Sequence, residues 1–191
     1  MRKIIICIFL VLTFICSCSE RNETAVDWFN KAVKLCKGGE CTDPKRAVKY
    51  LNNAIKLNPN YVDAYGIRGD IYENLRQYQR AIEDFNQEIR LKPNAEIYYT
   101  RGTTYFKLNN YQRAIEDFSE TIRLQPNNAD AYKNRGVTYK LLLQYQRAIE
   151  DFNKVISLKP DNDEAYQWRG GVILSRATKS LAALMRKKPV I

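Results

Sequence analysis

The segment of residues 77–86 reads QYQRAIEDFN, and nearly the same ten letters return at residues 110–119 (NYQRAIEDFS) and at residues 144–153 (QYQRAIEDFN). Successive copies begin 33 and 34 residues apart. A glycine and a proline recur with the same period, at Gly69, Gly102, Gly136 and Gly170 and at Pro59, Pro93, Pro126 and Pro160. A period of this length indicates a repeat protein, in which each unit buries its apolar face only by stacking on its neighbours.

Each period has the features of two helices. Apolar and small residues recur mostly at intervals of three and four, first at Tyr65, Gly69 and Tyr72, then at Ala81, Ile82, Phe85 and Ile89. A proline such as Pro93 ends the second helix, because it cannot donate the next backbone hydrogen bond. We expect Gly69 and Ala81 to face one another where two antiparallel helices cross, since neither has a bulky side chain.

These positions resemble the tetratricopeptide repeat, a 34-residue unit of two helices with conserved small, aromatic and proline positions. Three copies match well at residues 62–94, 95–128 and 129–162. A degenerate copy at residues 25–61 has three extra residues between its helices, and a fifth copy loses the pattern after Leu174. We expect residues 163–191 to form a partial repeat, a C-terminal cap and a basic tail. The resemblance implies an all-α fold, a right-handed superhelical solenoid of antiparallel helix pairs with a C-terminal capping helix or helix pair.

One departure from the family pattern is common to the copies. Position 7, usually leucine, is arginine in Arg68, Arg101, Arg135 and Arg169, and an aspartate recurs at position 23 in Asp84, Asp117 and Asp151. An arginine buried without a partner is costly. We therefore predict a ladder of Arg–Asp pairs, in which each arginine meets an aspartate of the same or the preceding repeat. The alternative is a stripe of arginines that binds anionic ligands.

The resemblance also implies a concave groove that is lined by the first helix of each pair and holds a peptide segment of a partner protein. The predicted groove residues are Phe29, Asp70, Glu73, Asn74, Tyr99, Thr103, Phe106, Lys107, Lys133, Val137 and Lys140. This groove would be acidic toward the second repeat and basic toward the fourth, with aromatic residues between, which suits peptide anchoring. The alternative is that these are ordinary exposed helix residues. Gly66 and Asp70 replace the Lys and Asn of the chaperone-binding members, so we do not expect a C-terminal carboxylate ligand.

The N-terminus has the features of a targeting segment. Two basic residues precede a twelve-residue, almost wholly apolar run, Ile4 to Ile15, which is too short to span a bilayer as a helix. The stretch from Ile15 to Cys18 resembles a bacterial lipobox, so residues 1–17 are predicted to be a lipoprotein signal peptide, Cys18 to carry the lipid, including palmitate, and residues 18–24 to be the lipidated tether. The alternative is an ordinary signal peptide or an uncleaved anchor. Ser19, rather than Asp, follows Cys18, which favours a bacterial cell-envelope protein, lipid-anchored on the periplasmic side of the outer membrane if the host is Gram-negative.

Cys36 and Cys41 are two free thiols or one disulfide, since no second pair completes a zinc site. The predicted signal peptide would deliver the chain to an oxidising compartment, where two remaining thiols favour a disulfide across the inserted turn.

Composition narrows the possible functions. The chain of 191 residues has no histidine, which excludes every histidine-based triad, base or metal site. The net charge is +10, but six basic residues after Glu164 and two at the N-terminus account for all but +2 of it. We therefore expect no nucleic-acid partner, no small-molecule substrate, no cofactor, no metal and no catalysis. The predicted function is a lipid-anchored adaptor that binds another protein; the alternative is a structural subunit of an envelope complex that packs through its convex face or basic tail.

Overall fold

The structure is a computed structural model that describes residues 23–37 and 40–186. The predicted signal peptide and Cys18 therefore lie outside the described residues. The described chain is divided into two compact units, one ending at Pro59 and the other beginning at Asn60. In the N-terminal unit the elements are α2 (Ala25–Leu35), β1 (Cys36–Lys37), β2 (Glu40–Cys41) and α3 (Pro44–Leu57).

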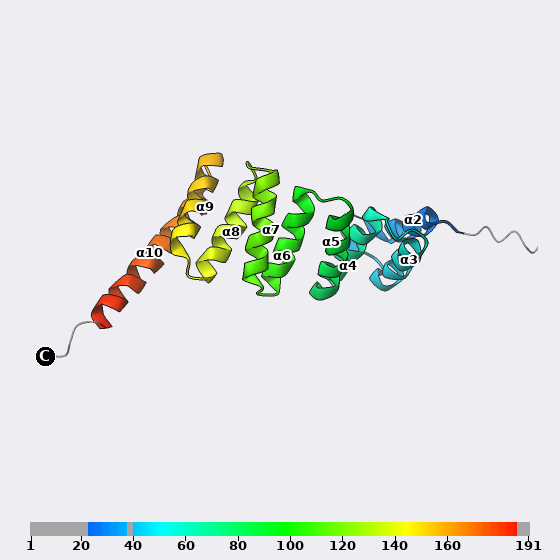
Figure 1. The fold of residues 1–191 in the computed structure, drawn as a ribbon, viewed down its shortest axis with the longest axis horizontal. Helices are drawn as coiled ribbons and strands as arrows, with labels where there is room; N and C mark the ends of the chain where they lie inside the picture. The colour runs from blue at the N-terminus through cyan, green and yellow to red at the C-terminus, as the bar shows by residue number, and fades with distance from the viewer. Residues whose placement is uncertain (1–22, 38–39, 187–191) are drawn as a thin grey trace, which may run out of the picture. The chain divides into compact units, whose positions relative to one another are not determined.

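The C-terminal unit is a row of helices in which each helix packs on the next (Figure 1). They are α4 (Val62–Asn74), α5 (Tyr78–Leu91), α6 (Ala95–Lys107), α7 (Tyr111–Leu124), α8 (Ala129–Leu141), α9 (Tyr145–Leu158) and α10 (Asp163–Arg186). The pairs α4–α5, α6–α7 and α8–α9 correspond to the three well-matched repeats. This arrangement confirms the all-α fold of stacked helix pairs that the sequence predicts.

A phenylalanine against a glycine holds each pair together. Phe85, Phe118 and Phe152 are fully buried at the same position of successive second helices. A Cβ atom added to Gly102 would lie 2.9 Å from Phe118 Cε1. The Cε1 atoms of Phe85 and Phe152 crowd Gly69 and Gly136 in the same way. The close approach of the two helices therefore requires glycine here. The three atoms nearest to a Cβ built on Gly69 all belong to the Phe85 ring, so the absence of a side chain at Gly69 makes room for this ring.

The tight turn inside each pair places a non-glycine residue in the left-handed region. The φ angles are 57° at Arg76, 58° at Asn109 and 59° at Leu143, all at the same repeat position. The following residue closes the turn, as where Gln77 N–H donates to the Tyr72 carbonyl at 2.8 Å. This is the bond of a Schellman motif, which satisfies a carbonyl that the helix end leaves without a partner.

The predicted arginine–aspartate ladder is present, and its ion pairs lie within one repeat. Arg101 Nε donates to Asp117 Oδ2 at 2.8 Å and Arg101 Nη2 to Asp117 Oδ1 at 2.6 Å. Arg68 with Asp84 and Arg135 with Asp151 repeat this bidentate geometry.

The third donor of the arginine reaches back to the preceding second helix. Arg101 Nη1 donates to Asn86 Oδ1 at 2.6 Å, and Arg135 Nη1 to Ser119 Oγ at 2.9 Å. Each of these two arginines therefore joins its own repeat to the one before, which explains how a half-buried cation replaces the usual leucine.

The N-terminal unit differs from a standard repeat at its turn. Between α2 and α3, the short strands β1 and β2 pair in antiparallel fashion with Cys36 opposite Cys41, and a disulfide joins these two residues. Asp43 caps α3 by accepting a hydrogen bond from Arg46 N at 3.0 Å, and Pro44 is the first helical residue. Trp28 of α2 packs against Tyr50 of α3 with ring centroids 5.4 Å apart.

The fifth copy is a single continuous helix rather than a helix pair. The helix α10 begins at Asp163, after the cap formed by Asn162, and runs without interruption to Arg186. Among residues 23–37 and 40–186, no helix is both long enough and apolar enough to cross a membrane.

Candidate functional site

Hydrogen bonds link the first helices α4, α6 and α8 to one another in series. Glu73 Oε1 on α4 accepts from Thr104 Oγ1 at 2.9 Å and from Lys107 Nζ at 3.0 Å, both on α6. Asn134 Nδ2 on α8 donates to the Tyr99 hydroxyl on α6 at 2.9 Å. The predicted groove residues Glu73, Lys107 and Tyr99 thus lie where successive first helices meet.

A small cleft of about 120 Å³ lies between α6 and α8. It is lined by Thr103, Phe106, Phe118, Asn134 and Val137. Three of these residues, Thr103, Phe106 and Val137, are predicted groove residues. The other two were not predicted: Phe118 is a core residue of the second helix α7, and Asn134 has no distinguishing signal in the sequence. The lining is mainly apolar, so the cleft fits one small apolar side chain.

Carboxylates gather at the α4 end of this surface. Asp70 on α4 and Glu88 on α5 interact with one another and with Glu96 on α6. Of these three carboxylates, only Asp70 is a predicted groove residue. Glu88 was not expected because it belongs to a second helix and reaches the site over Gly66. A Cβ atom at Gly66 would lie 3.0 Å from Glu88 Oε2.

The crowding changes the acidity of two of these groups. Partial burial, followed by repulsion from Asp70, Asp63 and Glu96, raises the pKa of Glu88 to about 7. Asp70 is exposed to solvent, yet partial desolvation and then the charges of Glu73 and Glu96 raise its pKa to about 6. This acidic cluster, Asp63, Asp70, Glu73, Glu88 and Glu96, is therefore a region where a cation would be stabilised.

The other predicted groove residues are not among those that line the cleft. Lys133 on α8 is 3.2 Å from Asp130 and lies over the Trp168 ring, 5.7 Å from its centroid. Lys140 is exposed near the end of α8, and Asn74 is exposed at the end of α4. Phe29 belongs to α2 of the N-terminal unit, so it is described separately from these helices.

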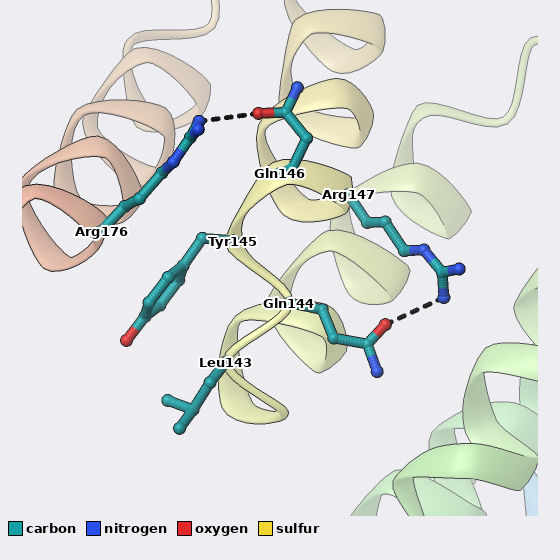
Figure 2. A pocket seen from close by; sticks show the side chains of 6 residues that line it. All are labelled: Leu143, Gln144, Tyr145, Gln146, Arg147 and Arg176. Carbon is teal, nitrogen blue, oxygen red and sulfur yellow. Dashed lines mark hydrogen bonds between the residues drawn. The ribbon is translucent and has the colours of Figure 1, made fainter. Parts of the chain in front are cut away.

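A second, open depression of about 550 Å³ lies beside the N-terminus of α9 (Figure 2). Its lining is mostly polar and comes from residues 143–147 together with Arg176 of α10. Arg176 Nη1 donates to Gln146 Oε1 at 2.7 Å, and Arg147 Nη1 donates to Gln144 Oε1 at 3.0 Å. Both arginines are thus engaged with glutamines of α9 or its cap. Within the part of the chain that the structure describes, no cluster of acidic or cysteine side chains could hold a metal ion.

The chain is similar to several solved helical-repeat structures. It is 28% identical to MamA protein with a TM-score of 0.75, and the match covers 86% of this chain and 89% of that one. The structure titled "YrrB: a TPR protein with an unusual peptide-binding site" has a TM-score of 0.72 at 22% identity, with 86% and 84% covered. The structure of the first TPR domain of Spaghetti, bound to an HSP90 peptide, has a TM-score of 0.57 at 24% identity, and the match covers 61% of this chain and 93% of that one.

A curated relative matches over a short segment. The UDP-N-acetylglucosamine–peptide N-acetylglucosaminyltransferase of Giardia intestinalis is 40% identical over 50 residues, which is 26% of this chain and 3% of that protein. Family models described as tetratricopeptide repeat match residues 42–96, 95–128 and 129–162. These matches cover well over half of the chain, in the same helix pairs that the structure shows, and the chain belongs to the tetratricopeptide repeat family.

Proposed function

We propose that this protein is a non-catalytic adaptor that binds a peptide segment of a partner protein across α4, α6 and α8. The observation that carries the proposal is the apolar cleft between α6 and α8 with a cluster of carboxylates on one side and lysines on the other. A repeat array presents such a row of side chains on a rigid frame, which suits recognition of an extended or helical segment.

The arrangement suggests the character of the peptide. An apolar side chain would enter the cleft beside Phe106 and Val137. A basic side chain toward the N-terminal side of the array would contact Asp70 and Glu88, where a cation relieves repulsion between carboxylates. An acidic side chain would suit the exposed Lys140. We therefore expect a mixed-charge segment with one apolar anchor.

Selection from a displayed random-peptide library tests this proposal. The purified protein should enrich peptides with a basic residue near an apolar one, and Phe106→Ala should lose them because the cleft loses one of its two phenylalanine walls. Tyr78→Ala is the matched control, since Tyr78 is a partly buried aromatic residue of the second helix α5. Equal enrichment by the Phe106→Ala variant and the native protein would contradict a groove in this place. It would favour a subunit that packs through another face.

We also propose that the protein is lipid-anchored at Cys18 in a bacterial envelope. The support is the sequence alone: the short apolar run and the Ile15–Cys18 stretch that resembles a lipobox. Cys18→Ser should abolish palmitate labelling and release the protein from the membrane fraction, whereas Cys16→Ser should change neither. Labelling that persists in Cys18→Ser and disappears in Cys16→Ser would place the lipid on the other cysteine.

A further inference from the structure

The first-helix part of α10 lacks the helix that covers every other first helix of the C-terminal unit. Tyr65 and Tyr72 of α4 are each 9% exposed, whereas Tyr166 and Ile173, at the same repeat positions of α10, are 43% and 49% exposed. Among the described residues, no atom beyond the neighbouring residues and backbone of α10 itself lies within 4 Å of a Cβ added to Gly170, although the equivalent glycines of α4, α6 and α8 face a phenylalanine ring.

The uncovered side of α10 is a continuous apolar stripe. One side of the helix packs on α9 through Ala165, Trp168 and Val172. Exposed apolar and small residues follow the other side at helical spacing, at Tyr166, Gly170, Ile173, Leu174, Ala177, Leu181 and Leu184. Leu181 and Leu184 are 60% and 65% exposed. An exposed apolar stripe of this length marks an interaction surface.

The second half of α10 carries a remnant of the missing second helix. Residues 175–181 read SRATKSL and follow the order of QRAIEDF at residues 79–85, with Arg, Ala and a large apolar residue in register. The distance from Gly170 to Ala177 is seven residues, whereas Gly69 to Ala81, like its counterparts in the next two repeats, is twelve. Five residues are thus absent. They correspond to KLNNY at residues 107–111, which run from the last residue of α6 through the turn to the first residue of α7.

Loss of the turn explains why α10 is continuous. Without it, the first-helix half of α10 runs straight into its second-helix half, and the two halves point away from one another along one axis (Figure 1). The second half therefore cannot fold back on its own first half. Shortening a hinge in this way is a recognised route to exchange of an element between two copies of a chain.

We propose that α10 pairs in antiparallel fashion with α10 of a second copy, so that the second half of each helix covers the first half of the other. In this register Leu181 of the second copy takes the place of the phenylalanine opposite Gly170. The contact is two-fold symmetric and self-complementary, as a closed dimer requires.

The charges of α10 fit this direction of pairing. The helix begins with Asp163 and Glu164, and all its later charged residues are basic, ending at Arg186. Antiparallel pairing brings Arg186 of one copy next to Asp163 and Glu164 of the other. Parallel pairing would align like charges instead, which opposes association.

The mass of the full chain in a mild detergent, measured by light scattering after size exclusion, tests the proposal. The native chain should have twice the mass of one copy. Leu181→Glu should halve that mass, because the charge would lie in the stripe. Leu57→Glu is the matched control, since Leu57 is 55% exposed on another helix, and should remain dimeric.

A second variant tests the mechanism of exchange. Inserting KLNNY between Leu174 and Ser175 restores the turn, so the second half can cover its own first half and the protein should become monomeric with its helix content retained. A native chain with the mass of one copy would overturn the proposal. So would a dimer that persists in Leu181→Glu, whatever the insertion variant does.

Discussion

At the scale of single residues, the half-buried arginine at repeat position 7 depends on its buried aspartate. The Asp117 side chain is 5% exposed and accepts two hydrogen bonds from Arg101, whose side chain is 18% exposed. Burying two charges costs much of what their attraction returns, but removing one leaves the other uncompensated. The intact pair therefore adds little net stability, but removing one partner should strongly destabilise the fold.

We predict that Asp117→Ala lowers the free energy of unfolding by about 3 kcal/mol, because the half-buried Arg101 loses its carboxylate partner. The double variant Arg101→Leu/Asp117→Leu, with the leucine that the family usually has at position 7, should recover most of that loss. Urea unfolding followed by circular dichroism measures both. A double variant that is no more stable than Asp117→Ala would show that the ladder contributes more than charge compensation.

A second residue-scale feature is the left-handed turn position. Leu143 has a φ of 59° and is 54% exposed, so its side chain gains little packing to offset the strain. Asn109 occupies the equivalent position, and asparagine tolerates this conformation better than leucine does.

We predict that Leu143→Asn raises the free energy of unfolding by about 0.5–1 kcal/mol. The reciprocal change Asn109→Leu should lower it by a similar amount. Thermal melting of both variants beside the native protein is the measurement. A shift of the same sign in both would exclude the backbone as its cause.

At the scale of elements, α4, α5 and α6 bring together carboxylates that repel one another. The pKa values of Asp70 and Glu88 are about 6 and about 7 in the folded chain, against ordinary values of 3.8 and 4.5. Between the ordinary pKa and the raised pKa of each group, the folded chain binds more protons than the unfolded chain. Their contribution to stability is therefore greatest below about pH 4 and is lost as the pH rises through 6 to 7.

We predict that the thermal midpoint is several degrees higher at pH 5 than at pH 7.5. The double variant Asp70→Asn/Glu88→Gln should melt above the native protein at pH 7.5, and this difference should shrink at pH 5. Glu116→Gln, at an exposed site on α7, is the control and should leave the pH dependence unchanged. A native midpoint that rises between pH 5 and 7.5 would mean that other carboxylates dominate the titration.

At the scale of the whole molecule, a repeat array must cover the apolar face of its last complete pair. The helix α10 does this for α9, because Ala165 contacts the cluster around Val155, which is 1% exposed, and Trp168 lies 5.9 Å from Phe152 between ring centroids.

We predict that deleting residues 163–191 exposes Val155 and Phe152, lowers the thermal midpoint and promotes aggregation. Circular dichroism melts and light scattering measure these effects. The Leu181→Glu variant is the informative comparison, because it keeps the contacts of α10 with α9 and alters only the far side. A truncated protein with an unchanged midpoint would show that α10 does not act as a cap.

The repeat period, the all-α fold and the partnership of Arg101 with an aspartate follow from the sequence alone. Helix ends depend on caps, prolines and periodicity within a few residues, so local sequence is sufficient to predict them. Even the start of α3 at Pro44 could be expected from the Asp43 cap.

Contacts between helices were decided only by the tertiary structure. It assigned the aspartate to the same repeat as its arginine, added Phe118 and Asn134 to the cleft, and brought Glu88 and Glu96 beside Asp70. It also showed α10 to be one helix. These outcomes depend on the distance and angle at which helices pack, and on whether a turn is long enough to reverse the chain. Those quantities arise from many side chains at once, so no single stretch of sequence encodes them.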